Sequence, residues 1–310
     1  MKNLLALSVV GCVAGMAGQA WAEFPEDKNV TLVIPFGAGG STDLVGRLLA
    51  KQLETILGQT VVATNQTGGA GTIGTAAVAD AAPDGYTIGY VPQGPLVMQP
   101  HRRNLPYDIE SFEYICRVTY DPAVLLTGPD TGIESIDDLV ERARTNPGQV
   151  VYVAVDGGLP QIAMQAFADS YGIDMKFIPG DYATAARYIG SNTAQVMVGQ
   201  ANIIEQFGLK PLAVFSDERV ESFGGVPTLA ENGHDVLLSF WYGLVTSKGT
   251  PADVVAQLSD ACAGAVRSEE FVEAMGTLHA PISYQGGSEF ESFVKAQYDE
   301  FGRYIQPAAN

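Results

Sequence analysis

The chain repeats one local pattern, in which a short apolar strand runs into a glycine loop and then into a helix. Residues 30–35 are apolar and β-branched, as in a buried strand, and Gly37-Ala38-Gly39-Gly40 follows them. Apolar residues then recur at i, i+4 spacing from Leu44 to Leu57, which predicts an amphipathic helix capped by residues 41–43 and ended by Gly58. This alternation predicts an α/β fold with a mainly parallel sheet.

The pattern continues along the chain in two sets. A second strand at residues 60–64 runs into the loop Gly68-Gly69-Ala70-Gly71 and a helix of small residues, and a third strand follows the Pro83-Asp84-Gly85 turn. In the second set, strands are expected at 150–155, 175–178, 195–198 and 212–215. One helix is expected to be capped by Ser135, another to start near Pro160 and a third to end at Arg187. Two closing helices are expected at 251–266 and 288–304.

Two extended apolar segments, residues 115–126 and 236–246, could link these two sets. If the chain crosses twice, the first lobe consists of residues 23–122 and 240–310, and the second of residues 123–239. Two α/β lobes joined by two strands form a hinged clamp, and ligands favour the cleft between such lobes.

The first 22 residues are predicted to be a cleavable secretory signal rather than part of the fold. Lys2 supplies the positive charge, an apolar stretch starts at Leu4, and Ala20-Trp21-Ala22 fits a cleavage site. A lipoprotein signal ending at Cys12 is the alternative. Elsewhere no apolar run approaches the ~18 residues of a membrane span. We therefore expect an exported, soluble, periplasmic protein.

Charge and cysteine content exclude several classes. Against 35 Asp and Glu there are 17 Lys and Arg, a net charge of −18, which argues against binding nucleic acid or anionic lipid. The three scattered His have no metal-ligand spacing, so no metal is expected. Cys116 and Cys262 could pair in an oxidising compartment. The sequence cannot place them within bonding distance, and two buried free thiols are the favoured interpretation.

The glycine loops are the candidate binding elements. A helix N-terminus presents unpaired N–H groups to an anion, and glycine lets the backbone approach it closely. Four such loops follow strands, at residues 37–43, 68–74, 156–158 and 180–181, and none contains Lys or Arg. Backbone amides and the hydroxyls of Ser41, Thr42 and Thr72 would then hold the anion. The alternative is that these glycines only form tight turns.

Enzymatic patterns are weak here. Gly69-x-Gly71-x-x-Gly74 matches a dinucleotide fingerprint, but it follows the second strand and lacks the acidic residue about 20 positions later. No Gly-Lys-Ser/Thr completes a phosphate-binding loop, and Ser41 is not in a nucleophile elbow. No catalytic residue is predicted, and an enzyme acting on a small anion is kept as an alternative.

Several segments in order along the chain carry a resemblance to one family. They are Val33-Ile34-Pro35-Phe36 with the loop through Asp43, Gly69-Ala70-Gly71-Thr72-Ile73-Gly74, Ala82-Pro83-Asp84-Gly85-Tyr86-Thr87, Leu105-Pro106-Tyr107-Asp108, Val226-Pro227-Thr228-Leu229-Ala230-Glu231, and Trp241-Tyr242-Gly243 with Gly249-Thr250-Pro251. With these segments the chain resembles the Bug-type (TctC-like) solute-binding proteins of tripartite tricarboxylate transporters.

The resemblance implies a periplasmic, non-enzymatic receptor with a two-lobed Venus-flytrap fold of the type II periplasmic-binding-protein class. It implies a monomer without cofactor that delivers a small organic acid to a membrane permease; a signalling partner is the alternative. Its anion end would be formed by Phe36, Gly37, Ala38, Gly39, Gly40, Ser41, Thr42, Asp43, Ala70, Gly71 and Thr72, flanked by Gln93.

The second lobe departs from the family pattern. Asp156 and Asp181 stand where members commonly have Ser or Gly, and they either cap helices or accept hydrogen bonds from a ligand amine or hydroxyl. Gly157 belongs to the same loop as Asp156. Trp241 lies on a proposed crossing strand, where it either lines the cleft or packs in the core. The predicted ligand is thus a small carboxylate that also bears a hydrogen-bond donor.

Overall fold

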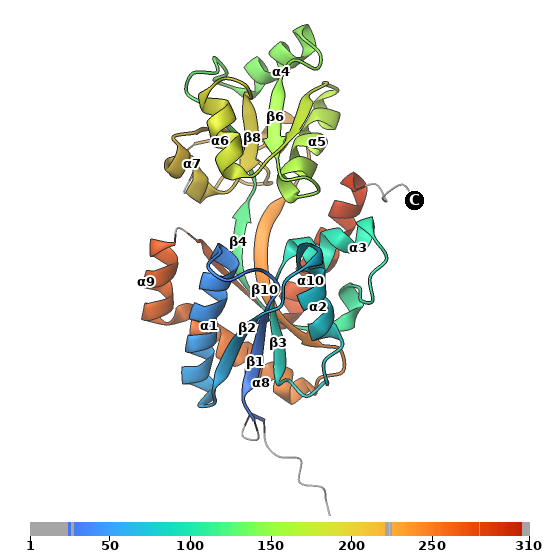
Figure 1. Cartoon of the computed structure of the whole chain (residues 1–310), viewed down its shortest axis with the longest axis vertical. Coiled ribbons are helices and arrows are strands. Elements are labelled where there is room, and N and C mark those ends of the chain that lie inside the picture. The colour runs from blue at the N-terminus through green and yellow to red at the C-terminus, as the bar shows by residue number, and fades with distance from the viewer. Residues whose placement is uncertain (1–23, 26–27, 221–222, 224, 279, 306–310) are drawn as a thin grey trace, which may run out of the picture.

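The computed structural model describes residues 24–25, 28–220, 223, 225–278 and 280–305. The predicted signal peptide and Cys12 lie outside these residues. Within them the strands form two sheets, each covered by helices and stacked along the long axis of the molecule (Figure 1). The first lobe is built on six strands in the order β11-β4-β10-β3-β1-β2, and the second on five in the order β7-β6-β8-β5-β9.

The first lobe contains both ends of the described chain. Its strands are β1 (Val30–Ile34), β2 (Val61–Asn65), β3 (Thr87–Pro92), β4 (Phe112–Pro122), β10 (Ser239–Ser247) and β11 (Ile282–Gly286). Its helices are α1 (Ser41–Leu57), η1 (Gly69–Gly71), α2 (Thr72–Ala79), η2 (Gly94–Met98), α3 (Gln99–Arg102), η3 (Ile109–Ser111), α8 (Ala252–Arg267), α9 (Glu269–Thr277) and α10 (Gly287–Tyr304).

The second lobe is the inserted part of the chain. Its strands are β5 (Val124–Thr127), β6 (Val151–Ala154), β7 (Lys176–Pro179), β8 (Val196–Gly199) and β9 (Lys210–Val214). Its helices are α4 (Ile136–Thr145), α5 (Leu159–Tyr171), α6 (Tyr182–Gly190), α7 (Ala201–Phe207) and η5 (Ala230–Asn232).

Local sequence explains the first β–α unit. The apolar side chains of β1 are buried, and α1 buries Val45, Leu49 and Leu53 on one face. Gly58 ends α1 in the left-handed conformation with φ 67°, where its N–H reaches the Glu54 carbonyl. The N-cap, however, is Gly40 rather than a residue from 41 to 43, because the chain turns into the helix one residue earlier than the side chains suggested.

The two crossings are β4, which leads from the first lobe to the second, and β10, which returns. They pair antiparallel beside each other (Figure 1). The expectation of a mainly parallel sheet is wrong for this reason. In the described chain β1 pairs in parallel with β2 and β3, but β10 is antiparallel to β3 and β4, and β11 to β4. β4 ends at Pro122 and β10 begins at Ser239, beside the predicted lobe boundaries, whose exact positions stay a prediction.

Cys116 on β4 and Cys262 on α8 form a disulfide, with their Cα atoms 6.6 Å apart. The favoured interpretation of two free thiols is therefore wrong, although both residues are fully buried as expected. They are 146 residues apart in sequence, and only the packing of α8 against β4 brings them together. Among the described residues, no helix is long and apolar enough to cross a membrane.

Candidate ligand-binding cleft

The loop between β1 and α1 leaves its backbone open. Residues 37–41 are exposed, Gly39 takes a positive φ of 84°, and Gly40 is extended at φ −79°. No side chain among the described residues caps the first turn of α1. The N–H groups at this helix start are therefore free to donate to an anion, and the binding of an anion here stays a prediction.

Asp43 braces this loop from behind. Its carboxylate is 2% exposed and accepts hydrogen bonds from the Gly39 amide at 2.9 Å, the Arg47 Nε at 2.9 Å and the Asn65 Nδ2 at 2.8 Å. The hydrogen bond from Arg47 is the main cause that lowers the pKa of Asp43 to about 2. Asp43 is therefore a fully partnered anion that shapes the loop and occupies the Gly39 amide.

The second glycine loop is held in left-handed conformations. Gly68, Gly69, Ala70 and Gly71 all have positive φ, and the exposed Ala70 does so at 58° despite its Cβ. The Thr72 hydroxyl donates to the Gly69 carbonyl at 2.8 Å, which fastens the turn to α2. This places Ala70 at an exposed loop tip and Thr72 in a supporting position.

The last glycine of this loop has a packing role. A Cβ on Gly74 would lie 2.5 Å from the Gln66 carbonyl oxygen and 2.9 Å from Pro35 Cα. Close contact between α2 and the end of β1 therefore accounts for Gly74, and positive φ values of 59° and 90° account for Gly69 and Gly71, so turn geometry and packing explain the fingerprint-like spacing.

Phe36 brings the two loops together. A Cβ on Gly71 would lie 3.1 Å from the Phe36 ring and equally close to Pro95, so all three residues pack at one point. Gln93, at the end of β3, is buried and accepts the Trp241 backbone N–H at 3.2 Å. The predicted residues of the first lobe thus gather at the ends of β1, β2 and β3.

The Trp241 side chain faces the core. It is fully buried, its Nε1 donates to Gln297 Oε1 at 3.3 Å, and its ring centroid lies 5.6 Å from that of Phe290 and 5.4 Å from that of Phe293. This arrangement matches the core alternative. Among the described residues, the backbone N–H of Trp241 links it to this end of the sheet through Gln93.

A cavity of about 170 Å³ lies between the lobes. Its described lining is formed by Ser41, Leu44, Val45, Tyr90, Thr119, Asp121, Gln200, Asn202, Phe240, Tyr242, Leu278, Ala280 and Pro281. Tyr242 stacks on Tyr90 with ring centroids 5.4 Å apart, and its hydroxyl lies 3.5 Å from the Thr42 hydroxyl, which donates to it. The start of α1 therefore shares one cavity with the crossing strands and with the start of α7.

Of the described residues that line this cavity, the sequence predicted only Ser41, and among the polar residues that it did not predict, Asp121 is the one that can carry a charge. It lies near the end of β4, is 5% exposed, and its Oδ2 accepts the Ala201 amide at 3.4 Å. Burial is the main cause that raises its pKa to about 6. The available signal was a lone acidic residue inside the apolar crossing segment 115–126.

The second-lobe loops lie at neighbouring strand ends, since β6 pairs in parallel with β7. Asp181 is the N-cap of α6, accepts the Thr184 amide at 2.8 Å, and has a pKa lowered by that bond. Asp156 is exposed and does not cap α5, because Gly158 takes that position. The described lining of the cavity contains neither aspartate, so their ligand contacts stay predictions.

Gly157 meets the first lobe directly. Its φ is 68°, its amide donates to Gln161 Oε1 at 2.6 Å, and a Cβ there would overlap the Arg102 guanidinium. The Asp156–Gly158 turn therefore rests against a side chain from α3. This contact joins the two lobes at a second point away from the crossing strands.

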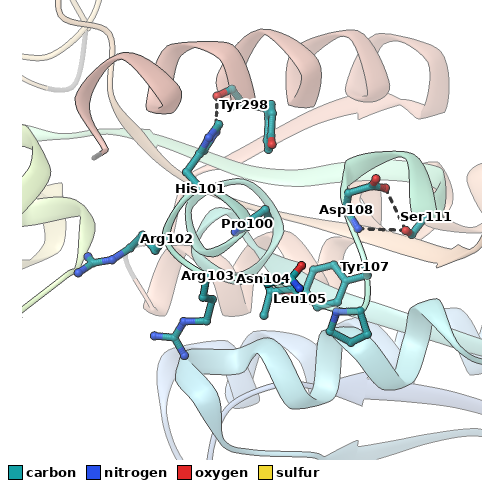
Figure 2. A pocket seen from close by; sticks show the side chains of 11 residues that line it. Pro100, His101, Arg102, Arg103, Asn104, Leu105, Tyr107, Asp108, Ser111 and Tyr298 are labelled. Atoms are coloured by element: carbon teal, nitrogen blue, oxygen red, sulfur yellow. Dashed lines mark hydrogen bonds between the residues drawn. The ribbon is translucent and has the colours of Figure 1, made fainter. Parts of the chain in front are cut away.

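A second hollow, of about 550 Å³, lies within the first lobe around residues 100–108 (Figure 2). His101 Nε2 donates to the Tyr298 carbonyl at 2.8 Å, and the Asp108 amide donates to Ser111 Oγ at 3.0 Å. Figure 2 shows Arg102 and Arg103 pointing in different directions, away from Asp108. The polar groups here do not converge on one point, which favours the interlobe cavity as the binding site.

The described residues contain no cluster of three or more His, Cys, Asp or Glu that could hold a metal ion. The cleft is thus built from backbone amides, hydroxyls, amides, aromatic rings and one carboxylate. Such groups can bind and orient a small polar molecule.

Comparison with known proteins agrees with this architecture. The family model TctC, the tripartite tricarboxylate transporter family receptor, matches residues 45–309. Protein BugT of Bordetella pertussis is 30% identical over 288 residues, covering 88% of this chain and 87% of BugT. A TctC solute-binding protein from Polaromonas superposes with a TM-score of 0.82 at 28% identity, covering 91% of this chain and 99% of that one.

A further solved structure, the periplasmic binding protein BugD, has a TM-score of 0.71 at 28% identity, covering 89% of this chain and 96% of BugD. The family match spans most of the chain, and the described lobes carry the cleft between them as a receptor requires. This chain belongs to the TctC family, the receptors of tripartite tricarboxylate transporters.

Proposed function

We propose that this protein is a periplasmic receptor that captures a small organic carboxylate between its lobes and delivers it to a tripartite tricarboxylate-type permease. The observation that carries the proposal is the uncapped start of α1, whose Ser41 lines the same cavity as Gln200 and Asn202 of the second lobe. A carboxylate bound there receives backbone N–H groups and the favourable end of the helix dipole.

The remaining parts of the proposal follow from family and sequence. The amino-terminal pattern of residues 1–22 supports export to the periplasm, where permease-coupled receptors act. We propose a monomer that works without cofactor, in which the loops at Phe36–Asp43 and Ala70–Thr72 hold the carboxylate. Asp156, Gly157 and Asp181 are proposed to border the cleft from the second lobe.

Native mass spectrometry of freshly purified protein tests this function, because a closed clamp retains its ligand. We expect a mass shift that disappears on denaturation and corresponds to a small carboxylic acid. A thermal-shift panel of organic acids, amino acids and neutral sugars follows, in which a ligand at 100 times its Kd adds about 2.7 kcal/mol of stability. Stabilisation by sugars alone contradicts the carboxylate assignment, and turnover of the bound acid favours the enzyme alternative.

A further inference from the structure

The described lining of the interlobe cavity contains one carboxylate, and the donors that it receives are neutral. Asp121 is 5% exposed, and it accepts the Ala201 amide at a long 3.4 Å and the side chain of Gln200. No Lys, Arg or His lies among the described residues that line the cavity. A buried carboxylate without a cation is unfavourable, and a ligand that supplies a positive donor removes that penalty.

Two further oxygens of the same lining can accept a hydrogen bond from a ligand. Asn202 Oδ1 has no hydrogen-bond partner within the described chain, and Thr119 Oγ1, on a residue that is 6% exposed, has none there but the Tyr90 hydroxyl. Each buried polar atom of this kind costs free energy until something pairs with it. Together with Asp121 they give the cavity several oxygen acceptors, contributed by both lobes.

Aromatic rings complete this surrounding. Tyr90, Phe240 and Tyr242 line the cavity, and the first and last of these stack with an interplanar angle of 17°. Ring faces attract cations as well as covering apolar surface. Acceptor oxygens beside aromatic rings are suited to an ammonium group, which has three donors and no acceptor.

The cavity lining therefore contains two chemically different groups. Ser41, at the start of α1, belongs to the part that suits an anion, and Asp121 lies on the crossing strand β4. An unsubstituted carboxylate would bring a second negative charge into a site that already holds Asp121. A hydroxy acid would add a donor but leave the charge unbalanced, whereas an ammonium group would supply both.

We propose that Asp121 selects carboxylate ligands that carry an ammonium group, by accepting its N–H hydrogen bond inside the interlobe cavity. This inference rests on the proposed function and narrows its ligand class. It assigns to Asp121 the acceptor role that the sequence suggested for Asp156 and Asp181, because Asp121 alone of the three is buried in the cavity lining.

Calorimetry on the purified full-length mature protein at pH 7.5 tests the assignment with two matched series. One is propionate, lactate and alanine, and the other is succinate, malate and aspartate; within each series only the substituent changes, from none to hydroxyl to ammonium. We expect the ammonium compound of at least one series to bind at least about 30-fold more tightly than its unsubstituted partner. This ratio is at the low end of the effects that close charge pairs have on affinity.

The variant Asp121→Asn keeps the shape and removes the charge. We expect it to reduce the preference for ammonium to within about threefold, while the unsubstituted acid binds at least as tightly as before. Asp260→Asn, the same chemical change on the exposed face of α8, is the control and keeps the preference. Asn202→Ala removes one acceptor without changing a charge, and should reduce the preference by about fivefold.

Three results overturn the inference. In the first, the folded Asp121→Asn variant keeps the full preference. The second applies if that variant does not fold, and in it the Asn202→Ala variant keeps the full preference for the ammonium compound. In the third, the unsubstituted or hydroxy acids bind as tightly as their ammonium partners in both series, which leaves the proposed function intact. Absence of binding by every carboxylate, with no retained acid in native mass spectrometry, instead contradicts the proposed function itself.

Discussion

Asp43 and Asp121 are both buried aspartates beside the cleft, but their surroundings differ. Asp43 is enclosed by one backbone amide and two side-chain donors, and its pKa falls to about 2. Asp121 receives only neutral donors among the described residues, a long bond from the Ala201 amide and a hydrogen bond from the Gln200 side chain, and burial raises its pKa to about 6. A carboxylate whose acceptor sites are filled holds a loop in place, whereas one left short of donors can still bind a ligand.

The largest expected effect comes from placing an unpaired carboxylate on the loop that Asp43 braces. Gly40→Asp should fold normally, because φ at Gly40 is −79° and the nearest atom to a new Cβ is 3.7 Å away. Two like charges about 4 Å apart at an effective dielectric constant of 20 cost about 4 kcal/mol, so affinity should fall roughly a thousandfold.

Calorimetry against the retained acid checks this result, with Gly40→Asn as the uncharged control of similar size. We expect the control to lose much less affinity than Gly40→Asp. Near-native affinity in folded Gly40→Asp would remove the β1–α1 loop from the site.

The raised pKa of Asp121 predicts a pH dependence of stability. The folded state binds this proton more tightly than the unfolded state does, so its stabilising effect is complete below about pH 4 and is lost as pH rises through 6. With an unfolded pKa near 3.8, the free energy of unfolding should gain up to about 3 kcal/mol from this group between pH 7 and pH 4.

Urea denaturation of the wild type and Asp121→Asn between pH 7 and pH 4 isolates the contribution of Asp121 to the free energy of unfolding. The contributions of the other titrating groups cancel when the two proteins are compared. Burial raises the pKa values of the neighbouring Tyr120, Tyr182 and Tyr242, which therefore stay neutral. A further hollow of about 760 Å³ is also lined by Asp121, and Glu205, which lines it too, remains in both proteins. Parallel pH profiles for the two proteins would show that Asp121 is not perturbed.

Asp43→Asn should have the opposite sign and a smaller size. Replacing the anion weakens charge-assisted bonds from Arg47 and Asn65, and we expect about 2 kcal/mol lower stability at pH 7. Since the Asp43 pKa is lowered, this stabilisation is present above pH 4 and is lost as pH falls toward 2. Chemical denaturation at pH 7 is the measurement, and unchanged stability would mean that the loop is held without Asp43.

The smallest effect concerns Asp181, an exposed aspartate that caps α6. We expect Asp181→Ala to lower Tm by a few degrees through the lost cap. Ligand affinity should stay unchanged, because the described cavity lining does not include this residue. Thermal melts with calorimetry separate the two roles, and weaker binding in addition to the lower Tm would place Asp181 at the ligand after all.

Some elements were predictable because their signals are local. Neighbours within a few residues decide the extent of β1 and the end of α1 at Gly58. The same holds for the cap at Ser135, whose hydroxyl accepts the Asp138 amide at 3.1 Å. α9 and β11 were missed: α9 spans nine residues directly after α8, and β11 is half-buried at a sheet edge. Elements this short carry weak periodicity, and packing on the rest of the lobe decides them.

The sequence by itself determined the α/β class, the two crossings, the two glycine loops at helix starts and the family, since these depend on local pattern and order. Only the tertiary structure decided that Cys116 pairs with Cys262, that Trp241 faces the core and that the Asp43 carboxylate is hydrogen-bonded to its own loop. It also decided that Asp121 stands in the cavity. Burial and partnering arise where distant segments meet, and an aspartate has the same letter whether donors surround it or not.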